Sequence, residues 1–103
     1  MTPAVSIVIP TQRRPGGLAT AMASALAQAG VDLATVELVV ADNDQVPSAR
    51  AAVEAVARAA PFPVVYVHEP AAGVANVRNT ALTVARGGII AFLDDDQEAP
   101  PGW

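Results

Sequence analysis

Residues 89–96 read I-I-A-F-L-D-D-D, five apolar residues followed directly by three aspartates. The apolar run, rich in branched and aromatic side chains, predicts a buried strand. Three like charges at a strand tip repel one another unless a cation or a positive ligand lies close to them. Since side chains alternate along a strand, Asp94 and Asp96 are expected on one face, with Cα atoms about 6.5 to 7 Å apart. Such a pair suits Mg²⁺ or Mn²⁺, although an acidic loop after a strand would read the same way.

Length and composition limit the alternatives. A chain of 103 residues forms at most one small domain, and with only four aromatic residues its core must be built from small side chains. The net charge of −4 and the absence of a basic stripe argue against nucleic-acid binding. The absence of cysteine excludes disulfides, thiolate metal sites and a cysteine nucleophile. Neither a signal peptide nor a membrane-spanning run is visible in the sequence.

Strand and helix patterns alternate along the whole chain. Strands are expected at residues 5–9, 36–41, 64–68 and 89–93, and helices at residues 18–29, 47–60 and 76–85. This order predicts a parallel sheet with right-handed crossovers and helices on its faces.

Every strongly polar cluster follows one of these strands. In parallel sheets, ligands bind outside the carboxyl ends of the strands, which all meet at one edge. The clusters at those ends are Pro10–Arg14, Asp42–Asp44, His68–Glu69 and Asp94–Asp96. Their placement on one edge favours a binding site over scattered surface charge.

Several nucleotide-binding motifs are missing. The chain has no lysine and therefore no P-loop, and no G-x-G-x-x-G follows the first strand. Response-regulator receivers and haloacid-dehalogenase phosphatases resemble the chain only loosely, because their acidic pair follows the first strand and the triplet here follows the fourth.

Four segments together resemble a known family. They are V-S-I-V-I-P-T at residues 5–11, E-L-V-V-A-D-N-D at 37–44, Gly73 followed by Arg78-Asn79, and F-L-D-D-D at 92–96 with Pro101 and Trp103 behind it. Over essentially its whole length, the chain resembles the N-terminal, nucleotide-sugar-binding half of a family 2 glycosyltransferase of the GT-A fold. The resemblance implies an α/β three-layer sandwich with a mostly parallel four-stranded sheet, with residues 1–103 forming part of a truncated domain.

The resemblance also implies the roles of individual residues. Pro10 and Thr11 would lie along the nucleotide, Asp42 would bond the base, usually uracil, and Arg78 would lie near the nucleotide. Asp96 would be the metal ligand, with Asp94 and Asp95 nearer the ribose and the sugar.

The segment after the first strand departs from the family pattern. Gln12 and Arg13 stand where the family often has an aromatic residue and an asparagine, which leaves the identity of the nucleotide open. Arg13 and Arg14 would either attract a diphosphate or form a solvated pair.

The implied enzyme transfers a sugar from a nucleotide-diphosphate donor, expected to be a UDP-sugar, to an acceptor hydroxyl. The resemblance implies inversion in a single displacement, with Mg²⁺ or Mn²⁺ as cofactor and a glycan or lipid-linked acceptor. The base that activates the acceptor is expected beyond Trp103, so this chain alone is not expected to transfer sugar. The expected location is the cytoplasm, with peripheral association with the membrane, and an exposed apolar face would favour self-association.

Two other classes remain open. A nucleotidyltransferase would also carry acidic metal ligands here, and Arg13, Arg14 and Pro15–Gly17 faintly resemble its glycine-rich basic loop, although the lack of lysine counts against it. A non-catalytic binding or assembly module would show no metal-dependent nucleotide binding.

Overall fold

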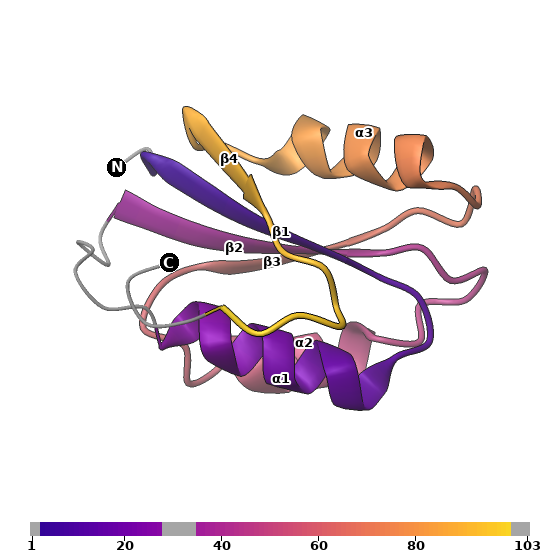
Figure 1. Ribbon diagram of the computed structural model, residues 1–103, viewed down its shortest axis with the longest axis horizontal. Helices are drawn as coiled ribbons and strands as arrows, with labels where there is room; N and C mark the ends of the chain where they lie inside the picture. The colour runs from indigo at the N-terminus through magenta and orange to yellow at the C-terminus, as the bar shows by residue number, and fades with distance from the viewer. Residues whose placement is uncertain (1–2, 28–34, 100–103) are drawn as a thin grey trace.

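The computed structural model describes residues 3–27 and 35–99, and the predicted contributions of Pro101 and Trp103 lie outside these residues. Strands and helices alternate as predicted (Figure 1). The elements are β1 (Val5–Thr11), α1 (Pro15–Leu26), β2 (Val36–Asp42), α2 (Arg50–Ala57), β3 (Val64–His68), α3 (Val74–Val84) and β4 (Ile89–Phe92).

All four strands of the sheet run parallel, in the order β3-β2-β1-β4. The predicted parallel sheet is therefore confirmed. The chain moves outward from β1 through β2 to β3, then crosses back to place β4 on the other side of β1. The direction of winding reverses between β1 and β4, which is where open α/β sheets bind ligands.

The helices form two layers around the sheet (Figure 1). The α1 and α2 helices pack on one face, where Ile7 and Ile9 of β1 join a core with Leu18 of α1. The α3 helix packs on the opposite face, where Val8 and Val77 are buried. Because the connection between β3 and β4 runs back across the sheet, right-handed crossovers require α3 to lie on this second face. The predicted three-layer sandwich is confirmed.

The first strand is longer than predicted, because it continues through Pro10 to Thr11. Val8 turns its carbonyl toward β4, where it accepts a hydrogen bond from the Leu93 N–H. Pro10 lies two residues further on and turns the same way, but β4 has already ended at Phe92. A proline without an N–H is therefore tolerated, because no strand is present to use the missing donor.

The fourth strand differs from its prediction in two ways. It ends at Phe92, one residue earlier than expected, and it is not buried, since Ile89 is 63% exposed. Within the described residues it pairs only with β1, so it is an edge strand, which explains its exposure.

The helix boundaries also shift. The second helix begins at Arg50 rather than at Pro47, because the segment before it forms a separate turn whose Ala49 N–H bonds to Asp42. The α1 and α3 helices begin three and two residues earlier than predicted. Among residues 3–27 and 35–99, no helix has the length and hydropathy needed to cross a bilayer.

A buried carboxylate fastens the start of β4 to the sheet. Glu37 is 2% exposed, and its Oε2 accepts hydrogen bonds from the Ser6 hydroxyl and the Arg86 N–H, both at 2.5 Å. The Ser6 hydroxyl oxygen in turn accepts the Gly87 N–H at 2.8 Å. These bonds fix the connection between α3 and β4, and with it the position at which β4 enters the sheet.

Candidate functional site

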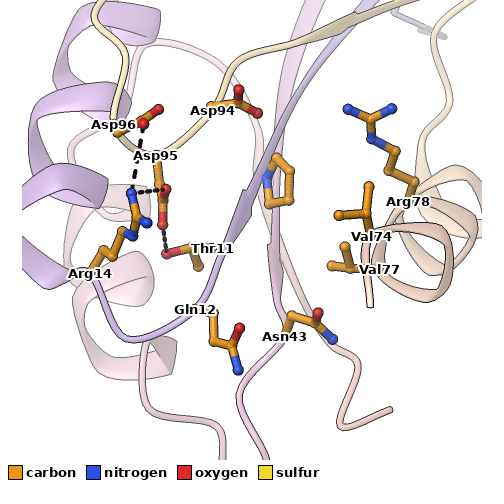
Figure 2. A pocket seen from close by; sticks show the side chains of 11 residues that line it. Thr11, Gln12, Arg14, Asn43, Val74, Val77, Arg78, Asp94, Asp95 and Asp96 are labelled. Atoms are coloured by element: carbon orange, nitrogen blue, oxygen red, sulfur yellow. Dashed lines mark hydrogen bonds and ion pairs between the residues drawn. The ribbon is translucent and has the colours of Figure 1, made fainter. Parts of the chain in front are cut away.

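A pocket of about 460 Å³ opens at the carboxyl ends of β1 and β4 (Figure 2). It lies at the reversal of the strand order, as the sheet topology predicts. The residues that line it come from the ends of β1, β2 and β4 and from α3: Pro10, Thr11, Gln12, Arg14, Asn43, Val74, Val77, Arg78, Asp94, Asp95 and Asp96. Six of the eight predicted site residues are among them, and Arg13 and Asp42 are not.

The three aspartates lie in a turn rather than on the strand. The N–H of Gln97 bonds the carbonyl of Asp94 at 3.0 Å, and the Gln97 side chain accepts the Asp94 N–H at 3.1 Å. We call Asp94–Gln97 the acidic turn. The predicted strand geometry is wrong here, because β4 has already ended. Exposure still alternates: Asp94 and Asp96 are exposed, while Asp95 is 9% exposed.

The central aspartate holds the acidic turn against the rest of the site. The Thr11 hydroxyl donates a hydrogen bond to Asp95 Oδ2 at 3.0 Å and so joins the end of β1 to the turn after β4. From the other side, α1 approaches so closely that a Cβ on Gly17 would lie 2.3 Å from the Asp95 carbonyl oxygen. Beyond the turn, the Ala99 N–H bonds the Ser24 hydroxyl of α1 at 2.9 Å. The α1 helix therefore supports the acidic turn and the residues that follow it.

The two neighbouring arginines point to different partners. Arg13 has a φ of 52°, in the left-handed region that a non-glycine residue rarely adopts. Its Nε donates to Asp44 Oδ1 at 2.9 Å, outside the pocket. Arg14 lines the pocket, with Nη1 3.7 Å from both Asp95 Oδ1 and Asp96 Oδ2. Of these two, Arg13 was the predicted substrate-binding residue, yet Arg14 is the one in the pocket.

Asp44, the carboxylate that pairs with Arg13, has a lowered pKa. Asp44 is 2% exposed, and its pKa lies below the ordinary value of 3.8. The main cause is the hydrogen bond from the Ser48 hydroxyl, followed by Arg13 and the Gln45 N–H, and together these outweigh desolvation. Arg13 therefore has a fixed structural partner.

Asp42, the predicted base-binding residue, is fully buried. One oxygen accepts the Asp44 N–H at 3.1 Å, and the other accepts the Ala49 N–H at 2.9 Å and the Tyr66 hydroxyl at 2.7 Å. Burial first, and the Asp42 carboxylate second, raise the pKa of Tyr66, so this hydroxyl remains a donor. Because the side chain is fully buried, contact with a nucleobase would require the residues that cover Asp42 to move.

Asn43, part of the polar cluster predicted after the second strand, lines the pocket and fixes one of its walls. Its amide donates to the carbonyls of Glu69 at 2.8 Å and Ala71 at 2.9 Å, and its oxygen accepts the Gly73 N–H at 3.2 Å. Gly73 has a φ of 126°, which a residue with a side chain rarely adopts, and it immediately precedes α3. Sequence reasoning missed this role because the three partners lie 26 to 30 residues further along the chain.

The α3 helix supplies the wall that lies across the pocket from the acidic turn (Figure 2). Arg78 lies with its guanidinium carbon 4.7 Å from the centroid of the Phe92 ring, a cation–π contact. Arg14 and Arg78 flank the pocket from opposite sides, with Asp94 between them (Figure 2). At the base of this wall, Glu69 accepts the Thr80 hydroxyl and the Ala71 N–H at 2.9 Å, which lower its pKa.

The donor set fits a divalent cation only if a ligand completes it. Among residues 3–27 and 35–99, no group of three His, Cys, Asp or Glu side chains is arranged to hold a metal ion. Exposed carboxylate oxygens on Asp94 and Asp96 are hard ligands of the kind that Mg²⁺ and Mn²⁺ accept, and these ions commonly take further oxygens from substrate phosphates. Two nearby guanidinium groups would favour the same phosphates.

Comparison with known proteins gives one matching family and two related sequences. The model of the family described as "Glycosyl transferase family 2" matches residues 6–103. The chain is 39% identical over 99 residues to the succinoglycan biosynthesis protein ExoM of Rhizobium meliloti, covering 96% of the chain and 32% of that protein. It is 32% identical over 100 residues to the uncharacterized protein MT1568 of Mycobacterium tuberculosis, covering 97% of the chain and 30% of that protein. The chain thus spans about a third of the length of these relatives.

Solved structures share the fold. The mannosyltransferase PcManGT from Pyrobaculum calidifontis, in complex with GDP-Man and Mn²⁺, superposes with a TM-score of 0.86 at 25% identity, over 99% of this chain and 30% of that one. S. aureus TarS 1–349 in complex with UDP superposes with a TM-score of 0.76 at 22% identity, over 89% of this chain and 27% of that one. The predicted GT-A fold is confirmed.

Proposed function

The chain belongs to glycosyl transferase family 2, and from that premise we propose that it forms the donor-binding part of an enzyme that transfers a sugar from a nucleoside diphosphate to an acceptor hydroxyl. The observation that carries the proposal is the pocket between β1 and β4, where exposed carboxylates and two guanidinium groups converge on one space. A diphosphate bound with a divalent cation carries both the negative and the positive charge that such a lining selects.

In this proposal, each predicted pocket residue has a role. Asp96 is the metal ligand, with Asp94 nearer the ribose and sugar, while Asp95 holds the turn through Thr11. Pro10 and Thr11 border the nucleotide, and Arg78 leaves Phe92 to pair with phosphate. A bound Mg²⁺ or Mn²⁺ would neutralise charge developing on the departing diphosphate.

The predicted roles of Asp42 and Arg13 need modification. Both side chains have protein partners outside the pocket, so we propose that they support the segments that carry Asn43 and Arg14.

The transfer itself is proposed as a single displacement with inversion. The bond from the sugar's anomeric carbon to the diphosphate breaks as the bond to the acceptor oxygen forms, and the acceptor proton passes to a base. That base is predicted beyond Trp103, so we expect residues 1–103 to bind the donor without transferring sugar.

The donor and its setting are the finer part of the proposal. A UDP-sugar remains our prediction, and a GDP-sugar is the alternative suggested by the PcManGT complex with GDP-Man and Mn²⁺. The similarity to a succinoglycan biosynthesis protein supports a polysaccharide or lipid-linked glycan as acceptor. A location in the cytoplasm, with peripheral attachment to the membrane, stays a prediction that cell fractionation would test.

Calorimetry on the purified chain tests the proposal. We expect UDP or GDP to bind in the presence of Mn²⁺, and binding to fall at least about ten-fold in Asp96→Asn, which removes one charge-assisted contact. Glu98→Gln, which removes an exposed carboxylate two residues away, is the matched control and should bind normally. If the affinity for nucleotide is the same with and without Mn²⁺, and is unchanged in Asp96→Asn, the proposed site is wrong.

A further inference from the structure

Arg14 occupies the position in which a cation would be expected beside the acidic turn. Its guanidinium Nη1 lies equally far, 3.7 Å, from Asp95 and from Asp96. In the part of the chain that the structure describes, these are the ion pairs of the acidic turn, since Arg13 pairs with Asp44 and Arg78 stacks on Phe92. The repulsion among the three aspartates is therefore partly relieved by Arg14 itself.

The backbone of Arg14 is held by the start of α1, while its side chain is exposed and held only by long ion pairs. Arg14 caps the N-terminus of α1, its carbonyl accepts the Leu18 N–H at 2.8 Å, and Pro15 follows it directly. Its side chain is nevertheless 58% exposed, and both ion pairs are long. Exposed pairs of this kind are weak, so little free energy holds the guanidinium in place.

We propose that Arg14 is a switching counter-ion: it neutralises the acidic turn in the empty site and moves to the diphosphate when a metal–nucleotide complex enters. The inference rests on the proposed function. A divalent cation on Asp96 would lie close to the Arg14 guanidinium, and the two positive charges would repel each other. A diphosphate in the same pocket gives Arg14 a new partner, to which guanidinium bonds in a planar, bidentate manner.

The consequence is coupling between metal and nucleotide. The cation alone must compete with Arg14 for the carboxylates, so its affinity for the empty site is reduced. With nucleotide bound, the competition ends and Arg14 adds a favourable contact. Because such coupling is reciprocal, nucleotide should strengthen metal binding as much as metal strengthens nucleotide binding. Arg14 would thus favour the joint binding of metal and nucleotide over the binding of metal alone.

The experiment compares Arg14→Gln with Arg58→Gln. Arg58 follows α2 and is exposed, so the control removes the same charge elsewhere. Free Mn²⁺ is measured by electron paramagnetic resonance, with the chain alone and with UDP or GDP added. In Arg14→Gln we expect Mn²⁺ alone to bind about two- to five-fold more tightly, the range of a lost exposed ion pair. We expect nucleotide with Mn²⁺ to bind about ten-fold more weakly, as for a lost hydrogen bond to a charged group.

A tighter affinity for Mn²⁺ alone together with a weaker affinity for nucleotide and Mn²⁺ would support the inference, because structural damage would weaken both affinities. If Arg14→Gln weakens both, or leaves Mn²⁺ binding unchanged while the unsubstituted chain still binds the Mn²⁺–nucleotide complex, the counter-ion inference is wrong and the proposed function stands. If the unsubstituted chain binds no nucleotide with Mn²⁺, the proposed function fails and the inference fails with it.

Discussion

Arg13 and Arg14 are adjacent and chemically identical, yet the structure gives them different tasks. The left-handed backbone at Arg13 turns one guanidinium toward Asp44 and leaves the next one at the acidic turn. A non-glycine residue in this conformation costs about 1 to 2 kcal/mol, and the ion pair with buried Asp44 opposes that cost. No sequence pattern around the pair distinguishes them, since the partners of both lie more than 30 residues away.

The Asp44 carboxylate gives this residue-scale arrangement a pH dependence. Its pKa is lowered in the folded chain, so its contribution to stability is complete above about pH 4 and is lost as the pH falls through the folded-state pKa. Asp44→Asn should therefore lower the free energy of unfolding at pH 7, and its difference from the unsubstituted chain should narrow toward pH 2. Urea unfolding at several pH values measures this.

The exposed Glu98 provides the control for this prediction. Glu98→Gln should change the unfolding free energy little at pH 7. A difference between Asp44→Asn and the unsubstituted chain that is constant between pH 7 and pH 2 would mean that the loss does not come from the ionised carboxylate.

At the scale of elements, α1 does more than the sequence indicated. The helix pattern in the sequence predicts packing on a face of the sheet, and the burial of Leu18, Ala21, Met22 and Ala25 confirms that packing. The pattern gave no indication that the first turn of α1 also supports the acidic turn through Gly17. Periodicity reports which face of a helix is buried, but close approach of two backbones leaves no periodic signal.

Gly17 and its neighbour Gly16 allow this support to be tested. A Cβ on Gly17 would meet the Asp95 carbonyl oxygen at 2.3 Å, whereas one on Gly16 would meet nothing within 4 Å. Gly17→Ala should displace the acidic turn, at an overpacking cost of about 1 to 3 kcal/mol. We expect Mn²⁺-dependent nucleotide binding to weaken about ten-fold, as a displacement cost of that order implies. Calorimetry and urea unfolding measure the two effects.

Gly16→Ala is the matched control, because alanine replaces glycine in the same helix without a clash. It should raise stability by about 0.5 to 1 kcal/mol and leave nucleotide binding unchanged. If both variants bind nucleotide equally well, α1 does not set the position of the acidic turn.

At the scale of the whole molecule, sequence order alone predicted that the polar clusters would meet. Alternating strands and helices require a parallel sheet, and a parallel sheet brings the ends of its strands to one edge, so Thr11, Asn43 and Asp96 line one pocket. What could not be predicted depends on contacts between distant residues. Examples are the loop held by Asn43, the burial of Asp42 under Tyr66, and the edge position of β4.

The edge position of β4 leads to a prediction about association. Within the described residues, β4 pairs on one side only, and Ile89 at its start is 63% exposed. Unpaired strand edges with apolar side chains bind other edges, and a charged side chain on the edge prevents this. We expect the chain to self-associate and Ile89→Lys to sediment as a monomer, with the unfolding free energy changed by about 0.5 kcal/mol or less, as for most surface substitutions.

Val46→Lys charges a residue of similar exposure in the turn after β2 and should leave association intact. Sedimentation velocity over a range of concentrations decides: a monomeric unsubstituted chain, or an equal effect of the two lysines, would show that the β4 edge does not drive association.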